Sequence, residues 1–141
     1  MSANSRMTVA IHILSFMVLW EQRRTELATS ERVAESVNTN PVVIRRLLGS
    51  LQKAGLVRSH RGKNAGWTLA KQPEAITLLD VYSAVEDAPL FSLHASQPNQ
   101  NCPIGRGVQP ALNKIYGALD RQLRGRLAKT TLAQVFADTM G

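Results

Sequence analysis

The chain has a single cysteine, Cys102, among its 141 residues. No disulfide can therefore form within one chain, which is consistent with a reducing cytoplasm. An apolar run over Val9–Leu19 is interrupted by His12 and Ser15 and is shorter than the roughly 20 apolar residues that a bilayer span requires. No charged segment followed by an apolar stretch and a small-residue cleavage site opens the sequence. We therefore expect a cytoplasmic protein without a membrane partner, and the apolar run predicts a core helix.

Acidic residues are missing from the interval between Glu35 and Glu74. Residues 1–70 hold ten Lys or Arg against four acids, whereas residues 71–141 hold seven against six, so the positive charge belongs to the first half. The basic residues in the interval are Arg45, Arg46, Lys53, Arg58, Arg61, Lys63 and Lys71. A surface of this kind suits a polyphosphate partner, and a solvated basic face is the alternative.

Groupings of catalytic side chains are also lacking. An enzyme needs a nucleophile beside a base, paired carboxylates or a metal, and the acids here are scattered along predicted helices. His12, His60 and His94 show no metal-ligand spacing with one another or with Cys102. On its apolar helix, His12 is expected to be a core histidine. We expect a protein that is not an enzyme and holds no metal.

Two short helices with a polar turn between them form the most informative pattern. Thr29 or Ser30 can cap a helix over residues 31–37, and residues 38–40 supply turn chemistry. Asn40 as N-cap and Pro41 at the first helical position then begin a helix that ends before Gly55. This spacing predicts a helix-turn-helix whose second helix, residues 40–54, enters the major groove of DNA.

The second of these helices has two contrasting faces. At helical spacing, one face carries the apolar residues Ile44, Leu47, Leu48 and Leu51, and the other carries Val42, Arg45, Arg46, Gly49, Gln52 and Lys53. The first face is expected to pack on the core. The second is expected to touch DNA.

A hairpin follows directly. Residues 56–61 and 67–70 predict two strands joined by a glycine-bounded tip, and the basic or polar residues on it are Arg58, His60, Arg61, Lys63 and Asn64. Such a hairpin is a wing that can reach phosphates or a narrow minor groove, and a plain surface hairpin is the alternative. We expect the wing, residues 58–66, to enter the minor groove.

The C-terminal part predicts a second region. Thr77 and Asp80 form a capping box for a fourth helix, and residues 88–104 read as a loop or linker. Residues 105–141 predict a long amphipathic helix and a short last helix. The apolar residues expected to meet a second copy are Val108, Leu112, Ile115, Leu119 and Leu123. The domain prediction is thus a winged helix-turn-helix over 1–87, a linker, and a dimerisation region over 105–141.

Several segments together resemble the Rrf2 family of bacterial transcription regulators. They are Arg6–Leu14, Asn40–Leu48, Lys53–Val57, Arg61-Gly62, Gly66–Leu69 and Ile76–Val81. The resemblance implies a winged-helix dimer crossed by a long C-terminal helix. It also implies base readout by Thr39, Asn40, Val42, Val43, Arg45 and Arg46, with Arg61 in the minor groove.

The chain departs from the resemblance at its cysteines. Several members of the family hold an iron-sulfur cluster through three cysteines in the loop before the long helix, where this chain has only Cys102. Clusters ordinarily require several thiolates, so we predict no cofactor. Cys102 is either a redox sensor, through a sulfenic acid, a mixed disulfide or a bridge to its dimer mate, or an inert thiol.

These inferences combine into one expectation: a mainly α fold with a small β-hairpin wing, acting as a homodimeric repressor on a palindromic duplex operator. An unknown small molecule or oxidant is its expected effector. The full set of expected DNA contacts is Ser30, Thr39, Asn40, Val42, Val43, Arg45, Arg46, Arg58, His60, Arg61, Lys63 and Asn64. The alternative is a winged-helix module for protein association or for nucleic-acid binding without sequence preference.

Overall fold

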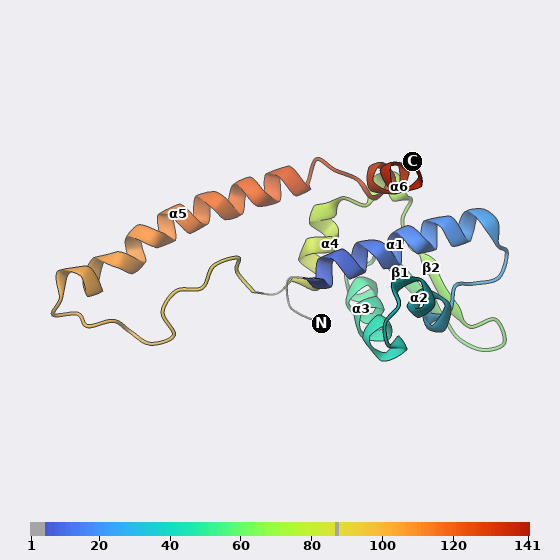
Figure 1. Cartoon of the computed structure of the whole chain (residues 1–141), viewed down its shortest axis with the longest axis horizontal. Helices are drawn as coiled ribbons and strands as arrows, with labels where there is room; N and C mark the ends of the chain where they lie inside the picture. Colours follow the sequence, from blue (N-terminus) through green and yellow to red (C-terminus); the bar gives the residue numbers. More distant parts are fainter. Residues whose placement is uncertain (1–4, 87) are drawn as a thin grey trace. The chain divides into compact units, whose positions relative to one another are not determined.

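The computed structural model describes residues 5–86 and 88–141, and the chain falls into two compact units. Unit 1 comprises the residues before 88 together with 128–141, and unit 2 comprises 88–127. The predicted boundary at residue 87 lies outside the described residues. The elements, in chain order, are α1 (Arg6–Arg23), α2 (Ser30–Val37), α3 (Pro41–Lys53), β1 (Val57–His60), β2 (Gly66–Leu69), η2 (Pro73–Ala75), α4 (Leu78–Val85), α5 (Pro103–Leu127) and α6 (Leu132–Met140) (Figure 1). The predicted class, mainly α with a β-hairpin wing, is confirmed.

Helix α1 supplies the centre of the core of unit 1. Ala10, Ile13, Leu14 and Met17 are fully buried on it, where they meet residues from α2, α3 and α4. Within the part of the chain that the structure describes, no helix is long and apolar enough to cross a membrane. The expectation for His12 was wrong: it is exposed, and its Nε2 lies 2.9 Å from the Ser36 hydroxyl of α2.

The helix-turn-helix forms as its capping residues predict. The Thr29 hydroxyl accepts a hydrogen bond from the Arg32 amide at 3.2 Å, which satisfies an otherwise unpaired donor at the start of α2. Asn38 ends α2 in the left-handed conformation, with φ 61°, which asparagine tolerates better than most residues. The Asn40 side chain then accepts from the Val42 amide at 2.8 Å and opens α3. Short polar side chains therefore determine where α2 begins and ends and where α3 begins.

Strands β1 and β2 pair antiparallel, with Val57 opposite Leu69 and His60 opposite Gly66. Gly66 has φ 155° and passes so close to the α1–α2 connection that an added Cβ would lie 2.6 Å from Leu27 Cβ and 2.8 Å from the Ala28 carbonyl oxygen. Only glycine fits there without a shift of backbone. The next amide, that of Trp67, donates to the Ala28 carbonyl at 2.8 Å and ties the hairpin to the α1–α2 connection.

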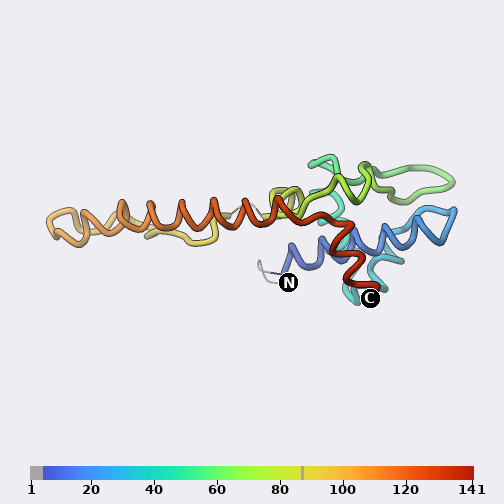
Figure 2. The backbone as a smooth tube through the Cα atoms, turned by 90° about the horizontal axis from the view of Figure 1, so that it is seen from above, coloured from blue at the N-terminus to red at the C-terminus, as the bar shows by residue number. Residues whose placement is uncertain are grey.

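The wing loop and the C-terminal end of α1 lie at the same end of unit 1 in both views (Figures 1 and 2). A hairpin that folded back over the helices would have its polar loop residues covered. The loop over residues 61–65 is instead exposed along its length.

Helix α6 belongs to unit 1 in the structure, although the sequence had grouped it with the long helix. It packs against α1 and η2, and Leu132 is fully buried. The Leu78 amide donates to the Thr130 carbonyl, and the Leu132 amide to the Ile76 carbonyl. Capping boxes at both α4 and α6, each with its threonine at the N-cap, flank this short pairing. The winged-helix unit is therefore closed by residues that follow α5 in the chain.

Unit 2 consists of a connecting segment and α5. Helix α5 begins at Pro103, two residues before the predicted dimerisation region, because proline suits the first helical position and the Cys102 carbonyl already accepts from the Arg106 amide at 3.0 Å. Pro110, which the sequence predicts in the first turn of this helix, lies inside it instead. Phe91 of the connecting segment stacks on Tyr116 with ring centroids 4.9 Å apart. None of the described residues of α5 is buried.

Candidate nucleic-acid interface

The outer face of α3 presents polar and basic side chains to solvent. Its apolar face, Ile44, Leu47, Leu48 and Leu51, is buried as predicted. Thr39, Asn40, Arg45 and Arg46 are exposed, and so is the apolar side chain of Val42, at 50 %. A helix that is buried on one side and free on the other can be inserted into a groove without disturbing the core.

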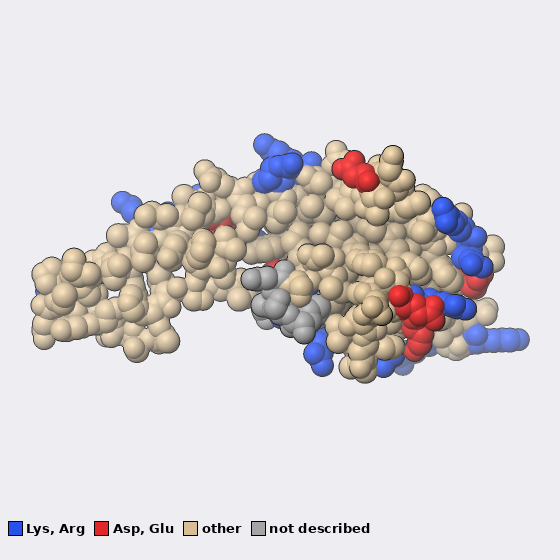
Figure 3. Space-filling view, viewed as in Figure 1, with Lys and Arg blue, Asp and Glu red and all other residues tan. Residues whose placement is uncertain are grey.

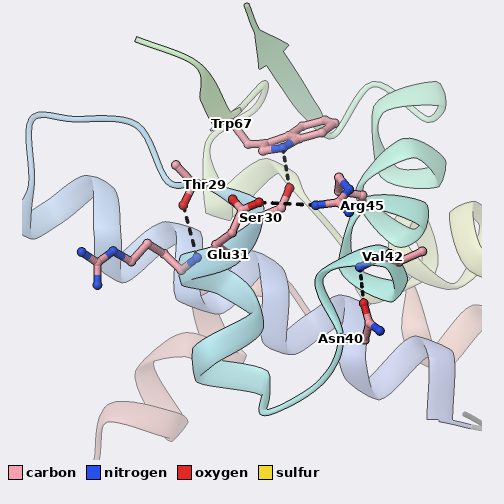
Figure 4. Close-up of polar contacts among 8 residues, drawn as sticks. Thr29, Ser30, Glu31, Asn40, Val42, Arg45 and Trp67 are labelled. Atoms are coloured by element: carbon pink, nitrogen blue, oxygen red, sulfur yellow. Dashed lines mark hydrogen bonds and ion pairs between the residues drawn. The ribbon is translucent and has the colours of Figure 1, made fainter. Parts of the chain in front are cut away.

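Two of the expected contact residues occupy other places. Val43 is partly buried and packs against the core. Ser30 is only 6 % exposed, and its Oγ accepts a hydrogen bond from Trp67 Nε1 at 3.2 Å (Figure 4). Both side chains therefore pack inward and hold the helices in place, so neither is available to contact DNA.

The Ser30–Trp67 bond joins the helix-turn-helix to the wing. Trp67 lies on β2 and also packs against the hydrophobic core, so that its ring and its N–H are both used. A buried hydroxyl and an indole N–H are costly to leave unpaired, which fixes the position of each element relative to the other. The sequence does not predict this bond, because nothing in the spacing relates residue 67 to residue 30.

The wing exposes the basic and polar residues expected on it. Arg58, Arg61, Lys63 and Asn64 are exposed, and His60 is exposed while its Nε2 lies 2.9 Å from the Thr68 hydroxyl of the paired strand. The contact with Thr68 ties His60 to the hairpin itself. Arg61, Lys63 and Asn64, in the exposed loop, are therefore better placed than His60 to contact a binding partner.

Glu21 supports the base of the wing from α1. Its Oε2 accepts a hydrogen bond from the Leu69 amide at 3.4 Å, at the end of β2. Burial raises the pKa of the Glu21 carboxyl above its ordinary value, and the bond from Leu69 lowers it in part. The net direction is upward, because the loss of water around a carboxylate outweighs one long hydrogen bond.

Charge on unit 1 is unevenly distributed. Figure 3 shows basic side chains at the end of the unit that carries the wing loop, and an acidic group over α2. The acids of α2 are Glu31 and Glu35, and each has a basic partner: Glu31 Oε1 lies 3.4 Å from Arg45 Nη1, and Glu35 Oε2 lies 3.6 Å from Arg32 Nη1. The ion pair between Glu31 and Arg45 connects the two helices of the helix-turn-helix, and sequence reasoning missed it.

The residues present do not fit an iron-sulfur cluster. Such clusters are held by several cysteine thiolates, and Cys102 is the one cysteine of the chain. Across residues 5–86 and 88–141, no three His, Cys, Asp or Glu side chains gather as a metal site would require.

Comparisons with known proteins agree with this architecture. The sequence profile of the Rrf2 family, described as iron-dependent transcriptional regulators, matches residues 3–138. YwnA of Bacillus subtilis, whose name places it among the HTH-type transcriptional regulators, is 42 % identical over 133 residues, which span 94 % of this chain and 95 % of YwnA. A crystal structure described as that of a DNA-binding protein is 39 % identical, with a TM-score of 0.73 over 93 % of this chain and 98 % of the other. A crystal structure described as a transcriptional regulator from Lactobacillus plantarum has a TM-score of 0.78 at 27 % identity, over 96 % and 89 % of the two chains. The chain belongs to the Rrf2 family of HTH-type transcriptional regulators.

Proposed function

We propose that the protein binds a palindromic DNA operator as a homodimer and represses transcription. The observation that carries the proposal is the outer face of α3, which is polar and basic while its other face is buried. In this proposal α3 enters the major groove, and Arg45 and Arg46 reach base edges or phosphates there. The remaining contacts proposed on α3 and its cap come from Thr39, Asn40 and Val42.

The wing completes the proposed interface. Arg61 is proposed to enter the minor groove, where a narrow groove concentrates negative potential. Arg58, His60, Lys63 and Asn64 are proposed to contact the sugar-phosphate backbone, which positions a protein on the duplex without reading its sequence. A repressor of this kind acts by occupying DNA that the transcription machinery needs.

Dimerisation is proposed to occur through α5. Its apolar side chains Ile115 and Leu119 are 54 % and 39 % exposed, and Val108, Leu112 and Leu123 are only partly covered. A 25-residue amphipathic helix with no buried residue needs an apolar partner. A second α5 supplies one, and two-fold symmetry of the dimer then matches a palindromic operator.

Selection of duplexes from a random pool tests the proposed function. The purified protein is expected to enrich a palindromic sequence and to bind it roughly a thousandfold or more tightly than a shuffled duplex at physiological salt. Equal affinity for both duplexes would instead favour nucleic-acid binding without sequence preference. No affinity for either would favour a module for protein association.

Oxidation at Cys102 is the proposed signal. The thiol is partly exposed and directly precedes the first residue of α5. Hydrogen peroxide oxidises the thiol, which reacts as its thiolate, to a sulfenic acid: one peroxide oxygen is transferred to sulfur and the other leaves as hydroxide, which takes up the thiol proton to form water. The sulfenic acid adds a polar oxygen at the start of the proposed dimer helix. We expect peroxide to weaken operator binding by the wild-type protein and to leave Cys102→Ser unchanged, as measured by fluorescence anisotropy. An equal peroxide response in both proteins would exclude the thiol as sensor.

A further inference from the structure

One acidic side chain lies within the proposed DNA-contact surface. Glu31 stands in the first turn of α2, and its Oε1 lies 3.4 Å from Nη1 of Arg45 on the outer face of α3 (Figure 4). The two side chains are 66 % and 50 % exposed, so the pair contributes little to folding stability. The Glu31 carboxylate instead affects which groups the Arg45 guanidinium can bind.

The backbone around Glu31 is fixed on both sides. Thr29 before it caps α2 by accepting from the Arg32 amide, and Ser30 is held by Trp67 of the wing. Figure 4 shows the Glu31 carboxylate and the Arg45 guanidinium directed toward one another from neighbouring helices. The negative charge is therefore placed beside Arg45 by structure that also positions the wing.

The neighbouring charges provide a contrast. Among the residues that the structure describes, Arg46 has no acidic side chain within ion-pair distance, although it adjoins Arg45 on α3. Glu35, one turn further along α2, pairs with Arg32 of the same helix. Of the two arginines proposed to enter the major groove, Arg45 alone is held by a carboxylate.

We infer that Glu31 is a specificity-determining residue that positions Arg45 for a guanine edge and opposes its use as a phosphate contact. A guanidinium has five N–H donors, so Arg45 can keep its bond to Glu31 while other donors reach the neutral acceptors O6 and N7 of guanine. A phosphate in the same place is repelled by the Glu31 carboxylate, at a distance where charges on a surface still interact.

The inference rests on the proposed DNA-binding function, and it predicts how strongly the protein prefers its operator over random DNA. On random DNA, Arg45 gains only a phosphate contact, which Glu31 weakens. On the operator, Arg45 gains a base contact, which Glu31 orients. Glu31 thus lowers affinity for random DNA more than affinity for the operator, and a protein that lacks its charge binds all duplexes with less discrimination.

The test compares Glu31→Gln with Glu35→Gln, a matched control that removes the same charge from the same helix without a contact to Arg45. The probes are a 30-base-pair duplex selected by the wild-type protein and a shuffled duplex of equal composition. Glu31→Gln is expected to bind the shuffled duplex roughly three- to tenfold more tightly at low salt, with a steeper salt dependence. Its ratio of selected to shuffled affinity is expected to fall about tenfold, whereas the control changes that ratio less than about twofold.

A second set of variants tests whether Glu31 acts through Arg45. Arg45→Ala is expected to lose preference for guanine at one position of the selected duplex, and adding Glu31→Gln to it is expected to reduce the ratio no further, since the two residues act as a unit. Equal ratios for Glu31→Gln and Glu35→Gln would overturn the inference while DNA binding stands. A wild-type protein that prefers no selected duplex would overturn the proposed function and the inference with it.

Discussion

Arg46→Ala combined with Arg61→Ala is expected to lower affinity for the selected operator roughly 10²- to 10³-fold. The double variant loses two proposed charge-assisted contacts, that of Arg46 in the major groove and that of Arg61 in the minor groove. A good arginine contact to a base contributes ~1–3 kcal/mol to the discrimination between bases. The dependence of the affinity on salt is also expected to become shallower, because fewer counterions are released from the duplex. Fluorescence anisotropy over a range of salt concentrations measures both quantities.

The control for this double variant removes the same charge from another place. Lys114→Ala with Arg121→Ala also lowers the net charge by two, but both positions are exposed on α5, on the side away from Ile115 and Leu119 and outside the proposed DNA-contact surface. The control is expected to lose less than about tenfold in affinity, through the weaker long-range field. If both double variants lost affinity equally, net charge would account for binding, and the assignment of α3 and the wing to the interface would be wrong.

The elements of unit 1 could be predicted because their ends carry local chemical signals. Asn40 with Pro41 begins α3, and the capping box at Thr77 begins α4, both as predicted. Each signal acts within three or four residues along the chain, so it can be recognised without knowledge of the fold. The same is true of the apolar face of α3, whose spacing determines which side is buried.

Contacts between residues far apart in sequence could not be predicted in this way. His12 was expected in the core because α1 is apolar, but it faces Ser36 across to α2. Ser30 was expected at the DNA surface, yet it is buried under Trp67. The grouping of α6 with α5 assumed that neighbours in sequence share a unit, whereas α6 pairs with the residues before α4. In each case the deciding partner lies at least 24 residues away.

The Glu31–Arg45 ion pair in the candidate interface is another contact that the sequence could not predict. Fourteen residues separate the two side chains, and the turn between α2 and α3 brings them to 3.4 Å. The sequence placed Arg45 correctly on the exposed face of α3, because helical spacing alone determines that. It gave no sign that a carboxylate lies beside it, which depends on how the two helices cross.

Ile115→Glu combined with Leu119→Glu is expected to convert the protein from dimer to monomer and to abolish detectable operator binding. The two side chains lie one turn apart on α5 and expose 54 % and 39 % of their surface. In the proposed dimer each change buries a carboxylate against apolar partner residues, and the two helices bring four like charges together. A single winged helix then holds one half-site alone and loses the gain in affinity that two linked half-sites provide. Sedimentation velocity measures the oligomeric state.

The matched control for this variant is Gln109→Glu with Asn113→Glu. It adds the same two charges to the same helix with the same spacing, but at 3.6 residues per turn these positions lie on a different face of α5. The control is expected to remain a dimer and to keep operator affinity within about tenfold of the wild type, since added negative charge only weakens the attraction to DNA. A dimeric Ile115→Glu, Leu119→Glu variant would exclude this face of α5 as the interface. A wild-type protein that sediments as a monomer while binding the palindrome tightly would exclude the homodimer altogether.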